Sequence, residues 1–126
     1  MRPAGLVLGG ALLLTSACAP EPAEAPAPAA LVLDCAQGFE VLSAKIAAEP
    51  GLTRATAPGE PYRYYNAADG HVSYVVTEPG GAGHPAIVRQ TATPAGMVED
   101  GCPYGDKAGY DELVAYLRSL AKVRGQ

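Results

Sequence analysis

The sequence contains no tryptophan, one phenylalanine and three cysteines in 126 residues. Lysine and arginine are nowhere clustered and the net charge is -4, which excludes the positively charged surface that nucleic-acid binding requires. The length leaves room for one domain of roughly 100 residues, whose small core gives a thin stability margin unless a cross-link supports it. We therefore expect one small domain, no nucleic-acid partner and an additional covalent restraint.

The sequence also lacks an apolar run long enough to span a membrane. Residues 5–17 are uncharged and mostly apolar, but a spanning helix needs about 20 such residues, and Pro20 and Glu21 interrupt this run. A short apolar run that follows Arg2 near the N-terminus is typical of an export signal. We predict a signal peptide over residues 1–17.

The end of this segment, Leu14-Thr15-Ser16-Ala17-Cys18, resembles the lipobox of bacterial lipoprotein precursors. In that family, small residues precede a cysteine that is lipidated and becomes the mature N-terminus. The resemblance covers the leader alone, and Thr15 stands where the family usually has leucine, with Leu14 one place earlier. It implies a lipid on Cys18 and a domain that is anchored to a membrane of the cell envelope and faces the periplasm.

An alternative is ordinary signal cleavage, because Ala17-Cys18-Ala19 also fits an A-x-A site. Cleavage after Ala19 would give a soluble periplasmic or secreted protein. The cysteine count favours lipidation, since three is an odd number for an exported protein. Lipidation of Cys18 leaves Cys35 and Cys102 to pair in a disulfide.

The rest of the chain divides into a tether and a domain. Residues 19–30 contain only alanine, proline and glutamate, which cannot form a core. We assign 18–30 to the lipidated cysteine and an Ala/Pro-rich tether, and 31–126 to a single small domain.

Helical signals stand at both ends of this domain. Asp34 and Gln37 resemble a capping box, and apolar side chains recur at helical spacing up to Pro50-Gly51. From Asp106 onward, apolar residues again recur with helical spacing, and acidic residues come early and basic ones late, which suits a helix dipole.

Between the helices, the sequence predicts three or four strands. Residues 62–66 and 71–77 are rich in tyrosine and valine and flank a turn segment, which is typical of a β-hairpin. Residues 86–93 predict a third strand and 97–99 a short fourth, whereas 51–61 read as a loop. We predict a two-layer α+β domain in α-β-β-β-α order, with an antiparallel sheet and both helices on one face.

The domain has no recognisable catalytic or metal-binding motif. His71 and His84 are the only histidines, and neither stands at a spacing that brings a second metal ligand. We expect no metal and no cofactor. The glycine-rich segment 80–83 leads into a predicted strand rather than a helix, so we interpret it as a connection and not as a phosphate loop.

Four of the seven tyrosines lie on the predicted hairpin, and with nearby polar residues they could form an amphipathic binding surface. The alternative is that these rings are the core, because the chain has a single phenylalanine. The residues of the candidate surface are Tyr62, Arg63, Tyr64, Tyr65, His84 and Arg89.

Three functional hypotheses follow. The leading one is a non-enzymatic envelope lipoprotein whose domain binds another envelope protein or a cell-wall glycan. A second is a small exported hydrolase that uses His84 or His71 with a carboxylate such as Glu78 or Asp100. A third is a structural spacer.

Overall fold

A computed structural model describes residues 5, 9, 10 and 31–123. The predicted lipidation site Cys18, the tether and most of the predicted signal peptide lie outside the described residues.

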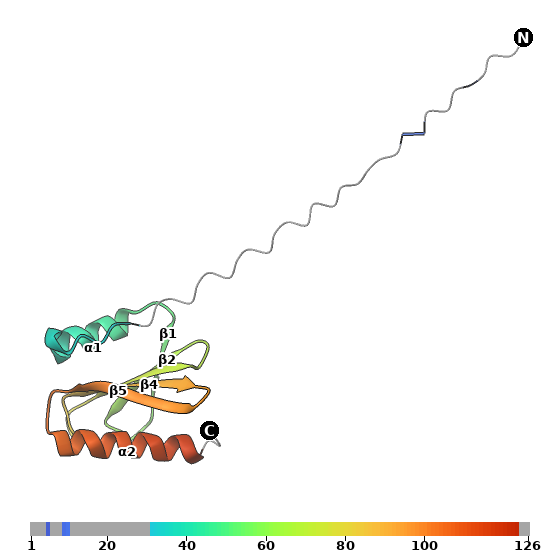
Figure 1. Ribbon diagram of the computed structural model, residues 1–126. Coiled ribbons are helices and arrows are strands. Elements are labelled where there is room, and N and C mark those ends of the chain that lie inside the picture. The colour runs from blue at the N-terminus through green and yellow to red at the C-terminus, as the bar shows by residue number, and fades with distance from the viewer. Residues whose placement is uncertain (1–4, 6–8, 11–30, 124–126) are drawn as a thin grey trace, which may run out of the picture.

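The described chain forms one five-stranded sheet in which each strand pairs antiparallel with the next along the sequence (Figure 1). This confirms the α+β class, but the prediction of three to four strands is wrong. The first strand lies in the segment predicted as a loop, and the last extends well beyond residues 97–99. The strands are β1 (Leu52–Thr56), β2 (Tyr62–Ala67), β3 (Val72–Thr77), β4 (Ala86–Thr93) and β5 (Gly96–Pro103).

A short 3-10 turn, η1 (Cys35–Gln37), and the helix α1 (Phe39–Ala48) precede the sheet, and α2 (Lys107–Val123) follows it. Gly38, at a φ of 88°, separates η1 from α1, so the predicted first helix is broken near its start. The Asp106 carboxylate accepts a hydrogen bond from the Gly109 amide at 2.9 Å and caps the first turn of α2.

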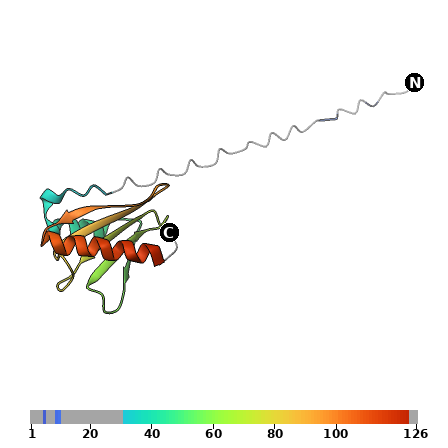
Figure 2. The same cartoon turned by 60° about the horizontal axis from the view of Figure 1, so that its bottom comes forward.

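The two helices cover opposite faces of the sheet, which makes the prediction that they share one face wrong (Figures 1 and 2). Ile87 packs in the cluster that contains Leu42 of α1, whereas its neighbour Val88 packs with Leu113 of α2. Successive residues of a strand point to opposite faces, so a strand buried on both sides reads as a continuous apolar run. Tyr74–Val76 is such a run, and all of it is buried.

The disulfide between Cys35 and Cys102 is confirmed and joins η1 to β5. Cys102 is fully buried in the α1-side core with Tyr65 and Tyr74. The hydroxyl of Tyr104 donates to the Cys35 carbonyl at 2.8 Å and adds a second contact at this junction. The N-terminal side of α1 is therefore fixed to the sheet covalently.

The glycine-rich loop packs directly on the first turn of α2. A β-carbon added to Gly109 would lie 2.5 Å from the Gly83 backbone nitrogen and 2.8 Å from its α-carbon. Only a residue without a side chain permits this approach, so the loop holds the start of α2.

Candidate functional site

The sheet face under α2 has an apolar half and a polar half. Val75 and Val88 are partners on β3 and β4, and Leu113 and Leu117 of α2 pack on them. A line of polar side chains crosses all five strands on the same face. On β3 and β4 it lies two residues from Val75 and Val88. We call it the polar row, and its members are Thr53, Asn66, Ser73, Gln90 and Glu99.

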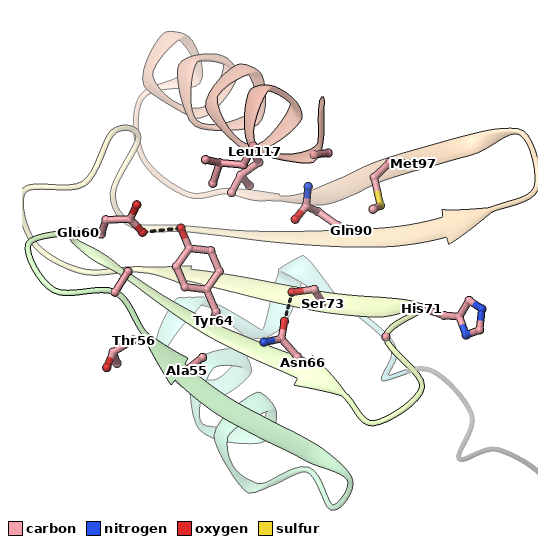
Figure 3. A pocket seen from close by; sticks show the side chains of 14 residues that line it. Ala55, Thr56, Glu60, Tyr64, Asn66, His71, Ser73, Gln90, Met97 and Leu117 are labelled. Atoms are coloured by element: carbon pink, nitrogen blue, oxygen red, sulfur yellow. Dashed lines mark hydrogen bonds between the residues drawn. The ribbon is translucent and has the colours of Figure 1, made fainter. Parts of the chain in front are cut away.

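Beside the C-terminal half of α2, this face is hollowed into a groove of about 350 Å³ (Figure 3). The middle of the polar row lines it, and the last turns of α2, the β1–β2 loop (residues 57–61) and β5 contribute the surrounding side chains. We call it the α2-side groove. The side chains that shape it are Glu60, Tyr64, Asn66, Ser73, Gln90, Met97, Leu117 and Leu120.

The amide and hydroxyl groups in the groove are only partly used within the protein. The Ser73 hydroxyl donates to Asn66 Oδ1 at 2.7 Å. Within the described part of the chain, the amide nitrogen of Asn66 and the whole side-chain amide of Gln90 have no hydrogen-bond partner. These groups can therefore donate to and accept from a ligand in the groove.

One carboxylate holds the β1–β2 loop against the sheet and α2. The Tyr64 hydroxyl donates to Glu60 Oε2 at 2.8 Å, and the Tyr116 hydroxyl donates to Glu60 Oε1. Burial and the hydrogen bond to Glu60 raise the pKa of Tyr64 well above its ordinary value. The same carboxylate hydrogen bond, with burial, raises the pKa of Tyr116. Both phenols stay neutral at neutral pH, and each oxygen of the Glu60 carboxylate accepts a hydrogen bond from one of them.

His71 lies on the rim of the groove, exposed to solvent. Its backbone amide donates to Asp69 Oδ1 at 2.9 Å, and its ring Nδ1 lies 3.5 Å from Asp69 Oδ2. The backbone hydrogen bond from His71 lowers the pKa of the Asp69 carboxyl. This pair closes the turn between β2 and β3.

His84 lies in a separate hollow of about 490 Å³ between α1 and the sheet, with Arg63 and Glu78. Its Nδ1 lies 2.8 Å from the Thr77 hydroxyl, which also contacts both the amide and the carbonyl of Ala86. Thr77 is fully buried, so its hydroxyl orients the imidazole and is not accessible as a nucleophile.

Ser43 lines the same hollow as His84, but no hydrogen bond joins the two, and the Ser43 hydroxyl has no partner within the described chain. Arg63 Nε lies 3.3 Å from Glu78 Oε1. The hollow therefore contains an ion pair and a histidine, but no accessible nucleophile is hydrogen-bonded to that histidine. Hydrolysis at His84 stays a prediction.

The structure divides the residues of the predicted binding surface between the two faces. Tyr62 and Tyr64 pack on the α2 side, and Tyr65 is buried in the α1-side core. Arg63 lies with His84 in the α1-side hollow. The remaining member is Arg89, which forms a two-point contact with Asp100 and donates to the Leu31 carbonyl at 2.9 Å.

Of that predicted surface, the α2-side groove contains Tyr64 alone. Sequence reasoning missed Glu60, Ser73, Gln90 and Met97, because each lies on a different strand or loop. Ser73 carried a usable signal, since it interrupts an otherwise apolar strand on the face that α2 covers.

Comparison with known protein families, with characterised proteins and with solved structures finds no match for this chain. Among the described residues, no helix has the length and apolar character needed to cross a bilayer. Within the same residues, no three side chains of His, Cys, Asp or Glu gather where they could hold a metal ion. The groove geometry is therefore the main guide to function.

Proposed function

We propose that this protein is an envelope lipoprotein, anchored through Cys18, whose domain binds a ligand in the α2-side groove. The observation that carries the binding role is the set of side-chain amide groups without partners in the described chain, which line the part of the sheet face that α2 does not cover. α2 packs on Val75 and Val88, and the sheet beside it forms a hollow. The side-chain amides of Asn66 and Gln90 line this hollow and have groups without a hydrogen-bond partner in the described chain. Unpartnered polar groups in a concave, partly apolar site are typical of ligand recognition.

Two observations support the envelope location. The Cys35–Cys102 disulfide joins residues 67 apart, and such bonds persist in oxidising compartments outside the cytosol. The lipobox-like leader supplies the anchor, and the Ala/Pro-rich tether would let the domain reach away from the lipid surface.

Site-specific crosslinking in cells tests the binding role. Met97 and Val98 are consecutive on β5, so one side chain lines the groove and the other points to the α1 side, where Val98 is exposed. A photoreactive residue at position 97 should give a discrete adduct that the same residue at position 98 does not. Equal adducts from both positions, or none from either, would contradict a ligand in the groove.

Mass spectrometry of the mature protein tests the anchor separately. We expect a diacylated cysteine at position 18 as the N-terminus, and a C18S variant released from the membrane. A mature chain that begins at Pro20 would instead show ordinary signal cleavage.

A further inference from the structure

The α2-side groove has almost no charge to offer a ligand. Among the described residues that line it, none is a lysine or arginine, and Glu60 is the one carboxylate. Each carboxylate oxygen of Glu60 accepts a tyrosine hydroxyl, and His71 lies at the rim beside Asp69. An anionic ligand would lose its hydration without meeting a lysine or arginine, which is costly. A cationic ligand would meet only the Glu60 carboxylate, whose oxygens already accept two tyrosine hydroxyls. The groove therefore favours a neutral ligand.

The spacing of the polar groups fits a chain that lies across the strands. Asn66, Ser73 and Gln90 are register partners on three adjacent strands, and neighbouring strands are about 4.8 Å apart. The three side chains thus present one polar group per strand over roughly 10 Å. Alternate side chains of an extended peptide repeat at about 6.8 Å, which does not match this spacing. The length of one hexose unit is comparable with the strand spacing.

The same groove combines polar and apolar contacts as a sugar chain requires. Asn66 and Gln90 supply amide groups that can pair with hydroxyl or acetamido groups. Leu120 and Met97, which are partly exposed, add apolar surface suited to the C–H faces of pyranose rings and to acetyl methyls. A sugar chain without acetyl groups would use this surface through its ring faces alone.

We propose that the α2-side groove binds a chain of neutral acetamido hexoses. This inference rests on the proposed binding function of the same groove. A peptide ligand is less consistent with it, because the available groups are side-chain amides on a sheet face rather than the backbone donors of a free strand edge.

The test uses the full chain in detergent micelles, with isotope labelling and NMR titration. The probe is a tetramer of N-acetylglucosamine, and the matched control ligand is the glucose tetramer of the same linkage. We expect the acetamido tetramer to shift the amide signals of Asn66, Ser73, Gln90 and Leu117, and the glucose tetramer to bind at least about tenfold more weakly, as the loss of one or two hydrogen bonds predicts.

Two variants assign the binding to the groove. Q90A should weaken the acetamido tetramer about tenfold, because it removes an amide that the fold itself does not use. Thr91 is the next residue of β4, points to the other face and makes no side-chain hydrogen bond within the described chain, so T91A should leave the affinity unchanged. Equal weakening by both variants would overturn the assignment to the groove.

Other outcomes separate this proposal from the broader one. No shift with either tetramer at millimolar concentration, or equal binding of the two, overturns the acetamido-glycan proposal. If a neutral polar peptide shifts the groove signals instead, the glycan class is overturned while the groove still stands as a binding site. If position 97 also gives no adduct in cells, the binding function itself fails.

Discussion

The two faces of the sheet are held in different ways. The α1 side is closed by a disulfide, two fully or nearly fully buried tyrosines and the side chains of Leu42 and Ile46. A hollow remains on this side too, but an ion pair between Arg63 and Glu78 lies in it. On the α2 side, the helix packs over the apolar half of the face, and a line of amide and hydroxyl groups runs beside the helix. The two faces therefore differ in what holds them, with a covalent bond and buried rings on one and side-chain amide groups without partners in the described chain on the other.

The largest test of this contrast is removal of the disulfide. Replacing Cys35 and Cys102 by serine frees a loop that the bond closes over 67 residues, and we expect a loss of about 4 kcal/mol in the free energy of unfolding. Urea denaturation measures it. C18S should leave the unfolding midpoint unchanged, and an equal loss in C18S would contradict the allocation of the three thiols.

A second test concerns the contact between the glycine loop and α2. In most helices Gly→Ala stabilises by up to about 1 kcal/mol. Here the new methyl would meet the Gly83 backbone at 2.5 Å, so G109A should instead destabilise by about 1 to 3 kcal/mol. Thermal unfolding shows whether G109A raises or lowers the stability. A115G, at an exposed site of the same helix, should lower the stability by up to about 1 kcal/mol, as helix propensity alone predicts. A stabilised G109A would mean that loop and helix do not touch.

A third test compares one tyrosine hydroxyl from each face. Y116F removes a hydrogen bond to the Glu60 carboxylate, which should cost about 1 to 2 kcal/mol because that acceptor is charged. Y104F removes an exposed hydrogen bond to the Cys35 carbonyl and should cost less, about 0.5 kcal/mol. Urea unfolding of both variants gives the comparison. The reverse order would show that Glu60 does not hold the β1–β2 loop to α2.

Alkaline titration tests the same cluster without substitution. The pKa of Tyr64 in the folded protein is raised above the ordinary 10.0, so the folded state holds this proton more tightly than the unfolded state. Stability from this group is complete below pH 10.0 and falls as the pH rises above it. The unfolding midpoint should drop less steeply above pH 10.0 in Y64F. An identical pH profile in Y64F and the unsubstituted protein would contradict the shift.

The smallest effect on stability is expected for Q90A, a substitution in the polar row. Q90A should change the free energy of unfolding by less than about 0.5 kcal/mol, because no hydrogen bond within the described chain uses this amide. Differential scanning calorimetry measures the change. A loss of several kcal/mol would show that Gln90 supports the fold rather than a ligand.

Sequence reasoning succeeded where the signal is local. The hairpin strands follow from two segments rich in tyrosine and valine that flank a turn segment, and α2 follows from its apolar spacing after Asp106. It failed at β1, because this edge strand has one half-buried residue, Leu52, followed by exposed ones and therefore no apolar pattern. It also failed at Gly38, whose positive φ ends η1 inside an otherwise helical pattern.

The sequence by itself determined the α+β class, the C-terminal helix and, once Cys18 is assigned to lipid, the pairing of Cys35 with Cys102. Only the tertiary structure decided that the helices lie on opposite faces. A run as short as Tyr74–Val76 is consistent with a strand buried on both sides but does not establish it, because periodicity over three residues distinguishes no face. The groove is likewise a tertiary property. Strand register brings Asn66, Ser73 and Gln90 together, and register is set by pairing between segments that are distant in the chain.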